Sequence, residues 1–451
     1  MKQRFLLKYE ASKFFPEVLS RLAPALPALL IYSIITLPNL WSQGLWYDEL
    51  FTADASSRGL NGLIDHLWEF PRVPFYAVVT IWTGSGELSA DWWIRLLPFA
   101  LTLMSIVLTS MIARLLGGIK AASIAPLVFS LNPLLVFHGS DANPYPLGVF
   151  LVALSTFFLV RLKVSDDGEI NQRKNFKYFV LSTGLIALFY LPGLVVLVPQ
   201  FVLGGKELWR DFRSAWYSKR IRVYLLTAVL LTAMLAVLSY ISRGDVMHSW
   251  LEVPQWGDLR AGLGLTGFEY ALPLSVAALL TRTGSKLLVG TVGGIGLIWL
   301  ISQLGSSWWI SRTFLPLSLF LAIGAALVVT RISWWQVTAI AALLILVASP
   351  QLVSASDLGA ARLEATAAKV FAKVGPVSAT VVSAYPALGF ALDRYAPEKM
   401  AIVIEQQSAG ITDQETWVLS STEVDGCVAV ASVTAEYHWF KCEPRRESTQ
   451  S

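Results

Sequence analysis

Two adjacent acids, Asp48 and Glu49, lie in the stretch "GLWYDELFTADA" over residues 44–55, shortly after a long apolar run. A carboxylate in such a place could take the proton of a hydroxyl group, as general bases do. A solvated turn would have little reason to keep Trp46 and Phe51 beside two acids, because large apolar side chains are drawn out of water. The pattern indicates that these acids serve chemistry at the edge of an apolar layer, although a solvated rim is the alternative for any single acid.

The elements that must position these acids are those of a membrane protein. The 451 residues are 55% hydrophobic and 15% charged and include 17 Trp, which is not the composition of a water-soluble domain. Apolar runs of about 20 residues, the length that a bilayer requires, recur from residue 22 to residue 350. The predicted spans, about eleven in number, are 22–40, 93–116, 119–138, 146–162, 178–191, 192–204, 223–241, 269–281, 287–303, 313–330 and 334–350.

Lys and Arg are concentrated on one side of these spans. The side that holds the N-terminus also holds the basic stretches 161–177 and 206–222, whereas the opposite side has few basic residues. The positive-inside rule then places the N-terminus in the cytoplasm and the C-terminus outside. We therefore expect a multi-pass protein of the plasma membrane whose first apolar run, which lacks a small-residue cleavage site, is an uncleaved span.

The predicted outer segments carry most of the polar residues. The first, residues 41–92, contains "RGLNGLIDHLWEF" and "PFYAVVTIW", which are typical of short amphipathic helices at the membrane surface with Trp at headgroup level. The second is the turn "HGSDANPYPLG" over residues 138–148. The Gly residues of "GTVGGIGLIW" lie inside a predicted span, where close helix packing is the simplest explanation.

The sequence becomes polar and alternating after residue 350. It predicts a membrane domain over residues 1–350 and a small extracytoplasmic α/β domain over 351–451. A helix that begins near 351 ends at Gly375 and Pro376. The remaining elements are a short helix "PALGFALDRY" and the strands "SATVVSAY", "MAIVIEQQ", "ETWVLSS", "CVAVASVT" and "HWFKC". Cys427 and Cys442 could form a disulfide between neighbouring strands or stay as two thiols.

Several short motifs occur in an order that resembles the GT-C superfamily of membrane glycosyltransferases. The resemblance is to the branch of protein O-mannosyltransferases and bacterial transferases that use polyprenyl-phosphate sugars. The motifs are "LWYDELFTA", "FPRVPFYAVVTIW", "WWIRLLPFALTL", "GSDANPYPLGVFL" and "ISRTFLPLSLFLAIG", which together cover residues 40–330. Two positions depart from the family pattern. Pro71 and Arg72 replace the His of a His-Pro-Pro run, and Asn143 stands in place of an Arg, so the sugar and the acceptor do not carry over from the best-known members.

The resemblance implies transfer of a single sugar, mannose or a pentose, from a polyprenyl-phosphate donor to a hydroxyl acceptor at the outer face of the membrane. Because a phosphate leaves without protonation, this single displacement needs one carboxylate base and no general acid. Asp48 is the predicted base, and Glu49 is expected to position the acceptor or orient the base. Arg312 first and Arg95 second are predicted to bind the donor phosphate, since each opens a span at its outer edge.

The remaining site predictions concern the substrate and its partners. His138, Asp141, Asn143 and Tyr145 are predicted to line the sugar or acceptor site. The expected partners are the lipid donor, a glycan, lipoglycan or protein acceptor, and membrane lipids, without nucleic acid. No cofactor is required. A divalent metal stays open, because His66, His138 and His248 share the outer side with many acids, although no ligand spacing marks a metal site.

A transporter or flippase of lipid-linked sugars is the alternative function. It would share the size, the Trp content and the polar rim of the enzyme. A translocation path, however, places ionisable groups near the middle of the bilayer. The predicted spans are almost free of acids, so the sequence favours the enzyme.

Overall fold

The structure is a computed structural model of the chain. It describes residues 20, 22–42, 44–67, 72–84, 90–164, 168–216, 253–258, 272–304, 308–356, 363–376, 378–383, 388–396, 400–405, 416–420, 427–433 and 437–442. The chain divides into two compact units. The first unit is Met1–Pro38, His66–Phe75 and Arg95–Ser356, and the second is Asn39–Asp65, Tyr76–Ile94 and Asp357–Ser451. Residues 41–65 and 76–92 of the first predicted outer segment thus share a unit with the tail, whereas the domain boundary expected at residue 350 stays a prediction.

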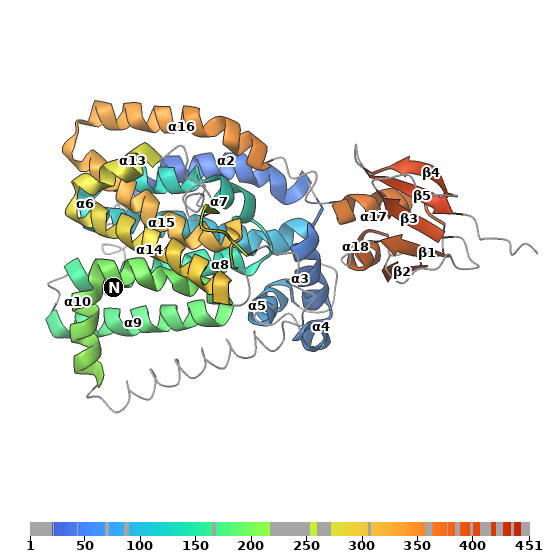
Figure 1. Ribbon diagram of the computed structural model, residues 1–451, viewed down its shortest axis with the longest axis horizontal. Helices are drawn as coiled ribbons and strands as arrows, with labels where there is room; N and C mark the ends of the chain where they lie inside the picture. The colour runs from blue at the N-terminus through green and yellow to red at the C-terminus, as the bar shows by residue number, and fades with distance from the viewer. Residues whose placement is uncertain are drawn as a thin grey trace, which may run out of the picture. The chain divides into compact units, whose positions relative to one another are not determined.

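The first unit is helical, and its elements are shown in Figure 1. They are η1 (Ala23–Ala25), α2 (Leu26–Ser42), α6 (Asp91–Ser130), α7 (Pro133–His138), α8 (Pro144–Val164), α9 (Gly168–Phe189), η3 (Leu191–Val196), α10 (Leu197–Trp216), α13 (Leu272–Ala277), η6 (Ala278–Leu280), α14 (Arg282–Leu304), α15 (Ser311–Val328), η7 (Val329–Arg331) and α16 (Trp334–Ser356). Two of these helices, α2 and α6, also extend into the second unit.

Six helical stretches among the described residues are long and apolar enough to cross a membrane. They are Ala23–Trp41, Asp91–Ser130, Pro144–Val164, Leu191–Arg210, Arg282–Gln303 and Ser311–Arg331. The protein is therefore a polytopic helical membrane protein, as the sequence indicates. The expected count of about eleven spans is not reached within this part of the chain, and the predicted span 223–241 lies outside the described residues.

The predicted division between the spans 93–116 and 119–138 is confirmed, whereas the predicted end of the second span at residue 138 is wrong. Gly118, with φ of 74° and ψ of −164°, divides α6 into two helices, because glycine adopts a positive φ without steric cost. The second of these helices ends at Ser130 instead of continuing to residue 138. Pro133 then starts the separate helix α7, and the side chain of Asn132 caps it by accepting the N–H of Leu134 at 2.8 Å.

Two other predictions of span boundaries are corrected. The stretch 269–281 forms only the short helices α13 and η6 within the described residues, so it does not make a full crossing there. The helix α9 begins ten residues before the predicted start at 178, at Gly168. The break predicted at Pro192 is present as the 3-10 helix η3, which leads directly into α10.

Helix α15 is the most buried of the candidate spans, with 89% of its apolar window inside the protein. It packs against α14, α8 and α7 (Figure 1). Glycines of α14 allow neighbouring helices to approach, as the sequence predicts. A Cβ atom at Gly290 would lie 2.4 Å from Cα of Pro199, and one at Gly294 would lie 2.9 Å from Cδ2 of Leu317. The buried helix α15 therefore gives Arg312, near its start, a fixed support.

Three short helices lie between α2 and α6 in the sequence. These are α3 (Tyr47–Ser57), α4 (Gly59–Asp65) and α5 (Val73–Thr83), of which α4 and α5 confirm the two short helices predicted from the sequence. Several Trp side chains of this region contact one another. The rings of Trp82 and Trp93 stack with centroids 4.8 Å apart, and Trp82 Nε1 donates to the carbonyl of Trp93 at 2.9 Å.

The tail confirms the predicted α/β composition. It consists of α17 (Leu363–Val374), β1 (Ser378–Ser383), α18 (Leu388–Tyr395), β2 (Met400–Glu405), β3 (Thr416–Ser420), β4 (Cys427–Ser432) and β5 (His438–Cys442). The five strands form one sheet in the order β2-β1-β3-β5-β4 (Figure 1). The strand β1 is parallel to β2 and β3, whereas β5 is antiparallel to β3 and β4. The predicted helix start near 351 is wrong, because residues 351–356 continue α16.

The tail domain is held by an aromatic core and a disulfide. The ring of Phe371 on α17 lies 5.4 Å from Trp417 and 5.1 Å from Trp439, and Trp439 Nε1 donates to the carbonyl of Ala367 at 3.0 Å. Helix α17 is thereby fixed on the sheet. Cys427 and Cys442 occupy paired positions of β4 and β5 and form a disulfide.

Candidate functional site

Asp48 and Glu49 lie in the first turn of α3. Their relative exposures are 4% and 0%, so both are buried and the solvated-rim interpretation does not hold for them. Glu49 Oε2 accepts a hydrogen bond from the backbone N–H of Trp46 at 3.1 Å, which caps the start of the helix. The first turn is also where the helix dipole stabilises a negative charge. Glu49 therefore serves the local fold, and Asp48 is the stronger candidate for a base.

The tail domain packs against the segment that leads into α3. A Cβ atom at Gly44 would lie 2.6 Å from Cβ of Ala365, so α17 could not come so close to any other residue without a shift. The backbone N–H of Leu45 donates to Tyr395 Oη on α18 at 2.8 Å. Residues more than 300 positions apart thus fix the entry to the helix that carries Asp48.

Glu364 adds a third buried acid to Asp48 and Glu49. It lies in the first turn of α17 with 5% relative exposure. Burial raises the pKa of Glu364, its own backbone N–H lowers that pKa, and the charge of Asp48 raises it. The negative form of Glu364 is therefore unfavourable in the folded protein.

We expect Glu364→Gln to stabilise the protein at neutral pH. A carboxyl group whose pKa is raised on folding contributes stability below its unfolded pKa and loses it as the pH rises through the folded pKa. The neutral amide removes this loss. The apparent Tm of the variant should exceed that of the parent by a few degrees at pH 7, and the two should converge near pH 4, close to the unfolded pKa of Glu, about 4.3. A variant with an unchanged Tm at pH 7 would contradict this prediction.

The first unit brings four of the predicted site residues together around one ring. His138 Nδ1 and Asp141 Oδ2 are 2.9 Å apart, and this pair orients the imidazole ring. The ring of Tyr145 lies 5.5 Å from that of His138 and 5.7 Å from that of Tyr190. The Cζ atom of Arg312 lies 5.5 Å from the centre of the Tyr145 ring, a cation–π distance. We call these five residues the tyrosine cluster.

Asn143 lies between the turn that carries Asp141 and the helix α8. It is fully buried, and its backbone N–H donates to the carbonyl of Asp141 at 2.7 Å. Neither Oδ1 nor Nδ2 of its side chain has a hydrogen-bond partner among the described residues. A buried amide without a partner is costly, and a bound sugar or phosphate would supply both a donor and an acceptor. Asn143 thus fits the predicted role in substrate binding.

Arg95 and His66 are both buried residues of the first unit. Arg95 lies on α6 with 1% relative exposure, and His66, which follows α4, has 2%. His248 lies outside the described residues. Within the part of the chain that the structure describes, no group of three or more His, Cys, Asp or Glu side chains could hold a metal ion. A metal site therefore gains no support from the described residues.

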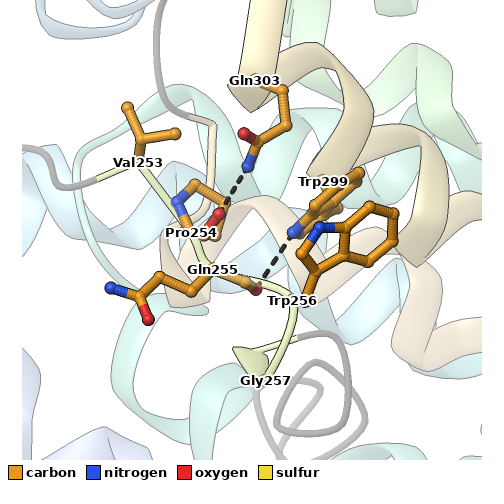
Figure 2. Close-up of a pocket in the computed structure, with 7 residues that line it drawn as sticks. All are labelled: Val253, Pro254, Gln255, Trp256, Gly257, Trp299 and Gln303. Carbon is orange, nitrogen blue, oxygen red and sulfur yellow. Dashed lines mark hydrogen bonds between the residues drawn. The ribbon is translucent and has the colours of Figure 1, made fainter.

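A pocket of about 440 Å³ lies beside α14, and its lining contains none of the predicted site residues. Figure 2 shows that Gln303 and Trp299 hold the segment 253–257 through the carbonyls of Pro254 and Gln255. The rings of Trp256 and Trp299 are 4.2 Å apart, and Trp256 is 75% exposed. Exposed Trp next to a membrane helix is typical of an anchor at headgroup level, so this surface is explained without a substrate.

Three residues near the candidate site were missed by the sequence analysis. Tyr190 contacts Tyr145 and donates from Oη to the carbonyl of Arg312 at 3.0 Å. Its position directly before the Pro-broken end of a predicted span is the only local signal. Glu364 and Tyr395 give no such signal, because Asp48 and Leu45, with which they interact, are distant in the sequence.

Comparison with known proteins supports the fold that these elements define. No protein-family model and no curated protein matches the chain. Among solved structures, ArnT from Cupriavidus metallidurans in the apo state matches with a TM-score of 0.59 and 13% identity, over 95% of this chain and 98% of ArnT. The same enzyme bound to undecaprenyl phosphate matches with a TM-score of 0.59 and 12% identity, over 94% of this chain and 98% of ArnT.

The chain thus shares the overall fold of ArnT, and the order of the sequence motifs agrees with this likeness. The likeness extends over nearly the whole length of both chains, so it includes the helical membrane part and the tail domain. At 13% identity it concerns the fold and does not define the reaction.

Proposed function

We propose that the protein is a membrane glycosyltransferase that moves a single sugar from a polyprenyl-phosphate sugar to a hydroxyl acceptor at the outer face of the plasma membrane. The observation that carries the proposal is the fold shared with ArnT, one structure of which holds undecaprenyl phosphate. Mannose or a pentose is the expected sugar. The acceptor is a glycan, a lipoglycan or a protein hydroxyl, and a glycan is preferred.

The reaction is a single displacement at the anomeric carbon of the sugar. The acceptor oxygen forms the new bond while the bond to the phosphate oxygen breaks, and the phosphate oxygen keeps the electron pair. The acceptor proton passes to the carboxylate of Asp48, which the first turn of α3 keeps buried and close to the positive end of the helix dipole. The configuration at the anomeric carbon is inverted.

Arg312 is assigned to the departing phosphate. Its guanidinium group is always charged and carries forked donors, and it lies over the ring of Tyr145 at the start of the buried helix α15. Asn143, with its buried and unpartnered amide among the described residues, is assigned to a sugar hydroxyl or to the phosphate. His138 and Asp141 are assigned to the sugar as an oriented pair, and Arg95 is the second candidate for the phosphate.

The test uses purified protein in liposomes with labelled polyprenyl-phosphate mannose, a polyprenyl-phosphate pentose and a polyprenyl-diphosphate oligosaccharide. Each donor is offered with a glycan, a lipoglycan and a peptide acceptor. We expect transfer from one of the monophosphate donors, with an inverted anomeric configuration and with activity that persists in a chelator. Movement of the labelled lipid across the bilayer without any product would instead support the transporter, and use of the diphosphate donor alone would refute the proposed donor class.

A further inference from the structure

The tail domain holds the carboxylate of Asp91 with two adjacent side chains of α18. Arg394 contacts Asp91 Oδ1 through Nε at 2.8 Å and through Nη2 at 2.7 Å. Tyr395 Oη donates to Asp91 Oδ2 at 2.7 Å. Asp91 is the first residue of α6. The tail is thereby joined to the start of a membrane helix through both oxygens of one carboxylate.

The same hydroxyl group also holds the entry to α3. Tyr395 Oη accepts the backbone N–H of Leu45 at 2.8 Å, and Leu45 is fully buried. Burial and the charge of Asp91 raise the pKa of Tyr395, which keeps the phenol protonated and able to donate to the carboxylate. One oxygen atom therefore links Leu45, three residues before Asp48, to Asp91 on a separate segment.

Two apolar contacts fix the orientation of the same segment. The ring of Phe51 meets that of Phe390 on α18 edge-to-face, with centroids 5.0 Å apart. The close approach of Gly44 to Ala365 on α17 lies on the other side of the first turn of α3 in the sequence. The residues before and after Asp48 are thus each in contact with a helix of the tail.

We propose that the tail domain is required for transfer because it positions the segment that carries Asp48, and that Tyr395 is the positioning residue. This inference rests on the proposed function. Tyr395 is not assigned a contact with substrate. Its hydroxyl group fixes the position of Leu45 relative to Asp91. Because Asp48 lies three residues after Leu45, in the first turn of α3, the position of Leu45 determines that of Asp48. A displacement of about 1 Å at a catalytic group can reduce turnover about 100-fold.

The experiment compares Tyr395→Phe with the parent and with Tyr437→Phe, the same chemical change directly before β5 of the same domain. Loss of the hydroxyl leaves the buried N–H of Leu45 without its acceptor. We expect kcat to fall about 10- to 100-fold with the KM for the lipid donor nearly unchanged. Hydrogen exchange at the amide of Leu45 should be faster in Tyr395→Phe, and Tyr437→Phe should match the parent in both measurements.

The two measurements separate the failure of this inference from the failure of the proposed function. A parent without transfer activity would refute the function, and the exchange at Leu45 would still decide whether Tyr395 holds the segment. Parent-like kcat in an active enzyme, or parent-like exchange at Leu45, overturns the positioning role and leaves the tail as a structural cap. If Tyr395→Phe does not fold, Asp91→Asn replaces it, because the weaker amide acceptor loosens the same link.

Discussion

Asp48→Asn is expected to lower kcat about 10²- to 10⁴-fold, the range that general-base catalysis supplies. The amide cannot accept the proton of the acceptor hydroxyl. The KM for the lipid donor should change little, because the donor phosphate is assigned to Arg312. The variant should still fold, since loss of the charge of a buried acid in the first turn of a helix costs up to about 2 kcal/mol. Initial rates with labelled donor and thermal unfolding of the purified variant are the measurements.

Asp65→Asn is the matched control for this substitution. Asp65 is the last residue of α4, its side chain is 55% exposed, and it forms an ion pair with Arg58 at 2.9 Å. Exposed ion pairs contribute about 0 to 1 kcal/mol to stability, so this variant should keep both fold and transfer. Full activity in Asp48→Asn would remove Asp48 from the mechanism, and equal losses in both variants would indicate a general effect of removing negative charge.

Local patterns predict those elements whose formation depends on neighbouring residues. The five strands of the tail are short and rich in β-branched residues, and each is present where the sequence predicts it. The end of α17 before Gly375 and Pro376 is likewise correct. In these cases the preference of the backbone and the later packing agree.

A predicted span is wrong where a single residue ends the helix although the average hydropathy of the run is high. The run 119–138 is largely apolar, yet the helix ends at Ser130 because Asn132 and Pro133 start a new one. As a result, His138 does not lie in a continuation of that helix. It forms a buried pair with Asp141 beside Tyr145. A hydropathy average does not detect such a change, because it weighs one proline against twenty neighbours.

The contacts around Asp48 could not be predicted, because they join segments that are far apart in the chain. Nothing near Leu45 indicates that Tyr395 accepts its N–H, and nothing in α17 indicates that the charge of Asp48 acts on Glu364. The sequence of the tail predicts its α/β composition and gives no sign of these contacts. The proposed positioning role of the tail rests on these tertiary contacts.

Arg312→Gln should cause the second largest loss, about 10²- to 10³-fold in kcat/KM for the lipid donor, as removal of one group that stabilises developing charge does. The neutral amide cannot balance the departing phosphate. Arg312→Lys should recover part of the loss, because it keeps the charge without the forked donors. Both kcat and KM are measured with labelled donor, and the variants should fold, since the guanidinium group lies at the partly exposed start of α15.

Arg331→Gln removes the same charge at the other end of the same helical stretch. Arg331 is exposed and ends η7, the short helix that follows α15 directly. The variant has the same net charge as Arg312→Gln. It should keep parent-like kcat/KM.

If both variants lose activity equally, the loss is caused by the change in the overall charge of the protein. If Arg312→Gln retains full activity, another residue binds the phosphate. Arg95, which is buried on α6, would then be the first residue to replace. A selective loss in Arg312→Gln that lysine partly restores would tie the guanidinium group to the leaving phosphate, because a purely structural role on α15 would not depend on the charge.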